Sequence, residues 1–266
     1  MTTTQPTIND ISNRYFPTFE TELSTAIEFS FNDARKPLED AIHYCVKSNG
    51  KRIRPLICMA TQHAINNQTN SATIIAIAIE LIHCYSLIHD DLPAMDNDDF
   101  RRGKPTCHKV FGDDIAILAG DVLNTYVFEY ISKQLPIHTT ESNTLRAIQS
   151  LAHACGPFGM AGGQVLDLKS SINQTSSLQQ LQTIHALKTG ALLELCFELP
   201  CALATNDNDM ITKMKDIGTE FGLLFQIIDD ILDETATFED IGKSPGKDKI
   251  QNKLTYPSLL GLTESL

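Results

Sequence analysis

Acidic residues gather at two places in the sequence, and their spacing points to metal chemistry. The segment LIHDDLPAMDNDDFRRGKPTCHK (87–109) has five aspartates within ten residues. A second group lies in LLFQIIDDILDE, where Asp229 and Asp233 are four apart and would share a helix face. Like charges this close repel one another unless they are neutralised or hydrated. Either group alone could be a solvated loop, but two groups that both follow apolar segments suit Mg²⁺, which takes carboxylates, waters and substrate phosphates.

Basic residues beside apolar segments are candidates for binding a polyanion. They lie in NGKRIRP, directly after the first acidic group, in HALKTGALLE and in IGKSPGKDK: Lys51, Arg52, Arg54, Arg101, Arg102, Lys188, Lys243 and Lys247. Forked guanidinium groups fit phosphate oxygens, although any one of these clusters taken alone is better explained as a solvated surface. No GxxxxGK[ST] occurs, so the sequence does not indicate a nucleotide P-loop.

Other kinds of site are not supported. His83 and His89 are six apart and no HExxH occurs, which argues against zinc, and no GxSxG marks a nucleophile. Seven cysteines form no CxxC pair and are predicted to be free thiols of a reducing cytoplasm. The net charge of −12 without a basic run argues against nucleic acid as a partner.

The elements that must position these residues are predicted to be helices. Apolar residues recur at three- and four-residue spacing through 27–46, 55–65, 116–135, 178–203 and 210–232. The stretch TIIAIAI alternates like a strand, but the apolar character continues past strand length, so we expect a helix there. Breaks are expected at positions that include Pro93, Pro136 and Pro200. The pattern predicts a single all-α domain of roughly eight to ten helices.

The long apolar segment 72–89 is predicted to be a core helix. It is interrupted by Glu80, His83 and His89, which argues against a membrane span. The first ten residues, MTTTQPTIND, have neither a basic nor an apolar region, so no secretory signal is expected there.

The motifs together resemble a known family. DDLPAMD with DDILD, and GKRIRP, RRGKPT, GGQVLDL, KTG, FQIIDD and KLTYPSLLGL, closely resemble the trans-isoprenyl diphosphate synthases, and among these the bacterial farnesyl diphosphate synthases (geranyltranstransferases). The resemblance runs from about residue 38 to 262. It implies the isoprenoid synthase fold, a single-domain bundle of about ten helices around a deep central cavity, spanning 1–266.

The resemblance also implies roles for individual residues. The resemblance implies three Mg²⁺ ions per active site. The residues that match the Mg²⁺ ligands of the family are Asp90, Asp91, Asp96, Asp229, Asp230 and Asp233. Those matching the grip on the allylic diphosphate are Arg101, Lys188 and Lys243. Those matching the isopentenyl diphosphate site are Lys51, Arg54, His83 and Arg102. Thr189 and Gln226 match positions that stabilise the allylic cation.

The implied chemistry accounts for these residue types. Cleavage of the allylic C1–O bond leaves a carbocation and a diphosphate, whose charge Mg²⁺ and basic donors can accept. The isopentenyl double bond then attacks the cation, and departing diphosphate is the expected base. Apolar walls would exclude water, which otherwise quenches the cation.

Product length is expected to depend on the helix turn before the first motif. Tyr85 and Ser86 lie five and four residues before Asp90, about one turn away. In the family an aromatic at the fifth position blocks elongation, and four residues separate Asp91 from Asp96, both of which imply the C15 product. The alternative is that Tyr85 is an ordinary core residue.

The sequence leaves alternatives to a farnesyl diphosphate synthase open. A geranylgeranyl diphosphate synthase is the alternative within the family, and a non-catalytic subunit of a heteromeric synthase is the alternative outside catalysis. A terpene cyclase would replace DDILD with an Asn/Ser/Glu triad. Family members continue beyond a point matching Leu266, so the resemblance implies that the last C-terminal helices are missing. It also implies a cytoplasmic homodimer.

Overall fold

The computed structural model describes residues 7–48, 50–170, 177–237 and 253–266. Of these described residues, 78% are helical. In the described part, strands occur only as a short antiparallel hairpin of β1 (Phe100–Arg101) with β2 (Lys104–Pro105). The prediction of an all-α fold is therefore confirmed.

The chain divides into two compact units. The first comprises Met1–Asp99, Thr106–Ile148 and Leu199–Asp207, and the second comprises Phe100–Pro105, Gln149–Glu198 and Asn208–Leu266. Helices α7 (Glu141–Cys155) and α10 (Ala191–Ala204) contribute residues to both. The single domain over 1–266 stays a prediction.

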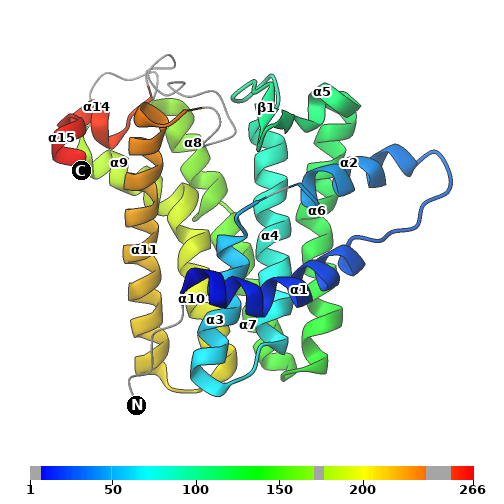
Figure 1. The fold of residues 1–266 in the computed structure, drawn as a ribbon. Helices are drawn as coiled ribbons and strands as arrows, with labels where there is room; N and C mark the ends of the chain where they lie inside the picture. The colour runs from blue at the N-terminus through cyan, green and yellow to red at the C-terminus, as the bar shows by residue number, and fades with distance from the viewer. Residues whose placement is uncertain (1–6, 49, 171–176, 238–252) are drawn as a thin grey trace. The chain divides into compact units, whose positions relative to one another are not determined.

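The first unit is built around a helix that is buried on every side. This helix, α4 (Asn70–Asp90), packs against α3 (Ile53–Asn66) and α6 (Asp113–Gln134) (Figure 1). Every residue from Ser71 to Ile82 is buried, which explains why TIIAIAI shows no helical alternation of polar and apolar residues. By length and hydropathy α4 could cross a membrane, but 78% of its apolar window is buried inside the structure, as in a core helix.

Three further helices complete this unit. They are α1 (Ile8–Ala26), α2 (Lys36–Val46) and α5 (Cys107–Phe111), and the single turn η1 (Leu135–Ile137) follows α6. The predicted helical segment 27–46 is helical only from Lys36. Helix α1 ends at Ala26, Ser30 takes a left-handed φ of 59° that a regular helix does not allow, and Pro37 favours a new helix start at Lys36.

The second unit packs around its longest helix. This helix, α11 (Asn208–Thr235), contacts α9 (Leu178–His185), the π-helical turn η2 (Ala186–Gly190) and α14 (Tyr256–Leu260). The remaining elements are α8 (Met160–Ser170) and α15 (Leu262–Ser265). A core cluster joins α9, α11 and α14 through the apolar residues Leu181, Leu223, Ile227, Leu254, Tyr256 and Leu259.

Proline positions agree with the predicted breaks in two cases and disagree in one. Helix α4 ends at Asp90, shortly before Pro93, and Pro136 lies in the η1 turn that follows α6. The break expected at Pro200 is wrong, because α10 continues through it to Ala204. Both neighbours of Pro200, Leu199 and Cys201, are buried, so packing compensates the missing hydrogen bond.

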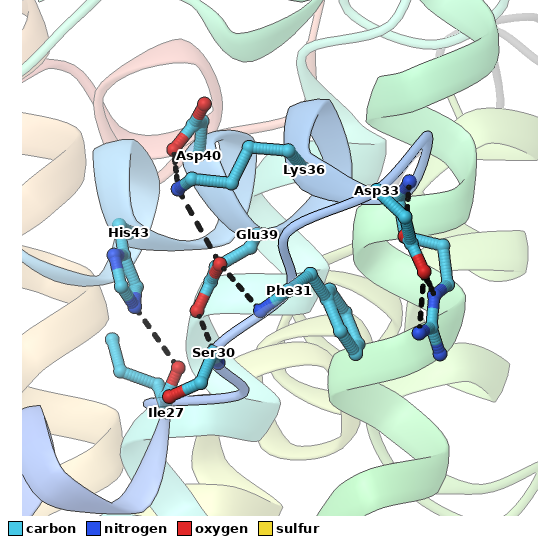
Figure 2. A network of polar contacts seen from close by, with 9 residues as sticks. Ile27, Ser30, Phe31, Asp33, Lys36, Glu39, Asp40 and His43 are labelled. Atoms are coloured by element: carbon cyan, nitrogen blue, oxygen red, sulfur yellow. Dashed lines mark hydrogen bonds and ion pairs between the residues drawn. The ribbon is translucent and has the colours of Figure 1, made fainter.

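A buried carboxylate fixes the turn that leads into α2. Figure 2 shows Glu39 accepting the backbone amides of Ser30 and Phe31, at 2.7 and 3.2 Å. On the next turn of the helix, His43 Nε2 lies 2.9 Å from the carbonyl oxygen of Ile27. These bonds replace the helical partners that the turn lacks, and they hold the helix that runs toward the basic segment 50–54.

Arg52 ties this basic segment into the core. Its guanidinium contacts Glu80 at 2.7 Å and Glu20 at 2.8 Å, and it donates to the carbonyl of Val46 at 2.8 Å. Both Arg52 and Glu80 are buried, and Arg52 has a left-handed backbone with a φ of 46°. Arg52 therefore has a structural role, unlike its neighbour Lys51, which is exposed.

We expect Arg52→Met to destabilise the protein by about 3–5 kcal/mol, because Glu80 would stay buried without its partner. Urea-induced unfolding followed by circular dichroism measures the change. The matched control Lys51→Met removes an exposed charge one residue away and should change stability by less than about 0.5 kcal/mol. Equal losses in the two variants would contradict the structural role of Arg52.

Candidate functional site

The first acidic group forms a loop that folds back on the end of α4. The amide of Asp96 donates to the carbonyl of Asp90 at 2.9 Å, and the amide of Asp98 donates to the carbonyl of Asp91 at 3.2 Å. Asn97, with a φ of 50°, makes the reversal possible. The backbones of Asp90 and Asp96 are thus adjacent although five residues separate them.

Burial distinguishes the aspartates of this loop. Asp90 and Asp96 are half-buried, whereas Asp91 is buried, at 3% exposure. Asp91 is close enough to the thiol of Cys45 to contribute to a raised pKa, although the hydrogen bond from Cys107 is the larger cause. Asp90 and Asp96 are therefore more accessible to a ligand than Asp91, whereas the exposed Asp99 pairs with Lys109 at 2.7 Å.

The turn of α4 before this loop carries the residues expected to set product length. Tyr85 and Ser86 are both half-buried, and the Ser86 hydroxyl donates to the carbonyl of His83 at 2.9 Å. Tyr85 packs edge-on against His89, with ring centroids 5.6 Å apart. His83, another predicted site residue, lies two residues before Tyr85 on the same helix and is half-buried.

The predicted basic site residues differ in exposure and in the unit to which they belong. Lys51 is exposed and Arg54 is half-buried at the start of α3, next to the anchored Arg52. In the second unit, Arg101 pairs with Lys104 across the β1–β2 hairpin, and Arg102 lies in its tight turn with a φ of 53°. This hairpin was not predicted from the sequence, because its Arg–Gly turn is a weaker signal than the usual Asn–Gly.

Lys188 lies in an ion pair on an unusual helical turn. Its Nζ is 2.7 Å from Oδ2 of Asp167, with side-chain exposures of 24% and 14%. Lys188 and Thr189 belong to the π-helical turn η2, a distortion that occurs often at functional sites. Sequence reasoning missed Asp167, although it lies in the quoted GGQVLDL, three residues after Gln164.

Close backbone packing sets the position of Lys188. A Cβ at Gly163 of α8 would lie 2.2 Å from the backbone nitrogen of Lys188, so only glycine permits this approach. Next to it, the buried amide group of Gln164 has no hydrogen-bond partner for either its nitrogen or its oxygen among the described residues. An unsatisfied buried amide is costly and suits a position that a ligand completes.

The second acidic group combines exposed and buried carboxylates on α11. Asp229 is exposed, whereas Asp230 and Asp233 are buried. Oδ2 of Asp230 accepts the amide of Tyr256 at 2.9 Å, at the start of α14. Its Oδ1 lies 3.9 Å from His185, whose pKa burial lowers to about 4. Asp230 therefore anchors the first turn of α14, whose N-cap is Thr255, and Asp229 is the exposed carboxylate of the pair.

Gln226 lies on the buried face of α11, one helical turn before Asp230. Asp229 and Asp233 are also one turn apart, as the spacing predicted, but their exposure differs. Lys243 and Lys247 lie outside the described residues. In the described part of the chain, no three His, Cys, Asp or Glu residues gather closely enough to hold a metal ion by themselves.

The structure brings together only some of the predicted site residues. Within the first unit it joins Asp90 with Asp96, and it places Tyr85, Ser86 and His83 on the same helix. Within the second unit it places Lys188 and Thr189 on one turn and adds Asp167. All seven cysteines are free thiols, as predicted.

Comparison with known proteins gives consistent matches. The family model for polyprenyl synthetases matches residues 35–265. A farnesyl diphosphate synthase of Geobacillus stearothermophilus is 43% identical over 97% of this chain and 86% of its own length. A chloroplastic geranylgeranyl pyrophosphate synthase of Capsicum annuum is 41% identical, over 94% of this chain and 69% of its own length.

A solved structure shows the same fold. The geranyltransferase of Helicobacter pylori, crystallised with magnesium and isoprenyl diphosphate, superposes with a TM-score of 0.86 at 33% identity. The superposition covers all of this chain and 87% of the other. The likeness extends to sequence, so it concerns more than the helical architecture.

We expect Gly163→Ala to destabilise the protein by about 1–3 kcal/mol, because the new methyl group would push the backbone of η2 away from α8. Thermal unfolding measures this change. Lys169→Ala, at an exposed position of the same helix, is the matched control and should have little effect. A Gly163→Ala variant as stable as the wild type would mean that η2 yields without cost.

Proposed function

Because the chain belongs to the polyprenyl synthetase family, we propose that this prenyltransferase condenses dimethylallyl and geranyl diphosphate with isopentenyl diphosphate to make (2E,6E)-farnesyl diphosphate. One observation carries the proposal: the amide of Asp96 donates to the carbonyl of Asp90, so the backbones of two half-buried aspartates lie next to each other at the end of α4. Carboxylates in such positions are stabilised when cations neutralise them.

The donor set fits Mg²⁺. Carboxylate oxygens are its preferred protein ligands, and this ion is usually held by one or two carboxylates, waters and substrate phosphates rather than by a complete protein cage. Asp90, Asp96 and Asp229 would supply the oxygens, with three ions per active site. Asp91, Asp230 and Asp233 are buried and would support these ligands.

The basic residues would hold the two diphosphates. Arg101, Lys188 and Lys243 are assigned to the allylic diphosphate, and Lys51, Arg54, His83 and Arg102 to isopentenyl diphosphate. The Asp167 carboxylate 2.7 Å from Lys188 would hold its ammonium group in place before substrate arrives. Such preorganisation lets the donor act without reorganising as negative charge develops.

The chain's own residues would then guide the reaction of the bound substrates. Bound Mg²⁺ supplies a Lewis acid for the charge that develops on the leaving diphosphate. Thr189 and Gln226 would direct their oxygens at the allylic cation. Gln226 is buried, at 8% exposure, so its carbonyl dipole would act with little screening by water. The released diphosphate would take the proton from the isopentenyl carbon.

Product length is the finer part of the proposal. Tyr85 lies one helical turn before Asp90, where an aromatic ring would limit the prenyl chain to C15. A geranylgeranyl product is the second candidate, because several relatives of similar identity carry that name. A non-catalytic subunit of a heteromeric synthase is less well supported, since both acidic groups are complete. Assembly as a homodimer and a cytoplasmic location remain predictions.

We expect the protein to convert geranyl and isopentenyl diphosphate to a C15 diphosphate in the presence of Mg²⁺, and EDTA to abolish turnover. Asp90→Asn should lower kcat by about 10²-fold or more, because it removes a ligand charge. Asp40→Asn, at an exposed carboxylate of α2, is the control and should retain activity. No product from the wild type would refute the proposed function.

Tyr85→Ala should shift the main product to C20 or longer, because the ring no longer limits the chain. Tyr85→Phe keeps the ring and should keep the C15 product. Chromatography of the dephosphorylated products reports both. An unchanged C15 profile in Tyr85→Ala would remove this role while leaving prenyl transfer itself in place.

A further inference from the structure

His89 links the residue expected to set product length to a neighbouring helix. It follows Tyr85 by one turn on α4, and the two rings are nearly perpendicular, at 86°, with centroids 5.6 Å apart. This is the edge-to-face arrangement that aromatic rings prefer. One ring can therefore restrict the rotamers open to the other.

His89 is itself fixed from α6. Its Nε2 lies 3.0 Å from the carbonyl oxygen of Ile117, and because a carbonyl only accepts, Nε2 carries the proton of this bond. The carboxylate of Asp121 lies farther away, 3.9 Å from the same nitrogen, beyond hydrogen-bonding distance. The hydrogen bond to Ile117 thus sets the orientation of the imidazole ring.

Gly120 of α6, which has no side chain, makes room for the imidazole ring of His89. A Cβ at Gly120 would lie 2.1 Å from Nε2 of His89, and its three nearest neighbours would all be atoms of this ring. The obstacle is a side chain rather than backbone, so a larger residue at position 120 would displace the imidazole before it displaced a helix. Gly120 and the carbonyl of Ile117 together form a seat for His89.

We propose that His89, seated on α6, is a positioning residue that holds Tyr85 in the orientation that limits product length. The proposal rests on the proposed function, in particular on the role of Tyr85. Two helices would then control chain length together: α4 supplies the ring of Tyr85, and α6 fixes it through His89. His89 would act through Tyr85 and would not touch the reacting atoms.

The test compares product lengths, normalised to total product so that changes in rate do not enter. His89→Ala should raise the C20 fraction at least several-fold, and Gly120→Ala should do the same because His89 can no longer reach Ile117. His89→Gln retains a donor for that carbonyl and should keep more of the C15 product than His89→Ala. Thermal unfolding of each variant separates this effect from loss of stability.

A double variant gives the decisive measurement. If His89 acts through Tyr85, then Tyr85→Ala/His89→Ala should give the same product lengths as Tyr85→Ala alone. Additive lengthening would overturn the proposal, because His89 would then act independently. An unchanged C15 profile in His89→Ala, with a lower melting temperature, would also overturn it and leave a purely structural role.

The same series distinguishes this failure from failure of the proposed function. If Tyr85→Ala lengthens the product and His89→Ala does not, only the positioning role is lost. If Tyr85→Ala has no effect, the role of Tyr85 is refuted, and the positioning role with it. If the wild type makes no prenyl product, the proposed function itself is refuted.

Discussion

The repulsion between neighbouring carboxylates is the constraint on which the candidate site depends. The loop after α4 keeps Asp90 and Asp96 adjacent through the hydrogen bond between the amide of one and the carbonyl of the other. Backbone groups can enforce this proximity because the helix ends there and leaves carbonyls without helical partners. Under the proposed function, a bound cation and its anionic substrate would further offset this repulsion.

The structure assigns different tasks to aspartates that look equivalent in the sequence. In DDILD, Asp229 is exposed while Asp230 accepts the amide of Tyr256 at the start of α14. In DDLPAMD, Asp91 is buried whereas Asp90 and Asp96 are half-buried. Acidic runs of this kind therefore contain both ligand candidates and residues that hold the local backbone in shape.

Sequence periodicity predicted most of the fold because local spacing determines which helix faces are apolar. It predicted α3, α6 and α11 to within a few residues, and it identified α4 in spite of its strand-like TIIAIAI. It failed in the segment 27–35, where the buried carboxylate of Glu39 stabilises a turn that no periodicity reveals. The break expected at Pro200 failed because tertiary packing outweighs the missing hydrogen bond of one residue.

The candidate site was predictable as residue types but not as contacts. Lys188 could be proposed from KTG, yet its pairing with Asp167 joins positions 21 residues apart through the fold. Arg52 looked like the other bases of NGKRIRP, and only its burial between Glu20 and Glu80 reveals a structural role. These contacts arise from packing between helices, which local sequence patterns do not encode.

Residues that perform no chemistry decide where the chemical groups lie. The buried ion pair of Arg52 holds the segment between Lys51 and Arg54 in place. Gly163 permits α8 to approach the backbone of Lys188. Packing distances between helices vary little, because interiors are dense and resist deformation. A side chain mounted on such a contact has little freedom to shift. The proposed prenyl transfer would benefit from this rigidity, because a rearrangement that admits water would quench the carbocation.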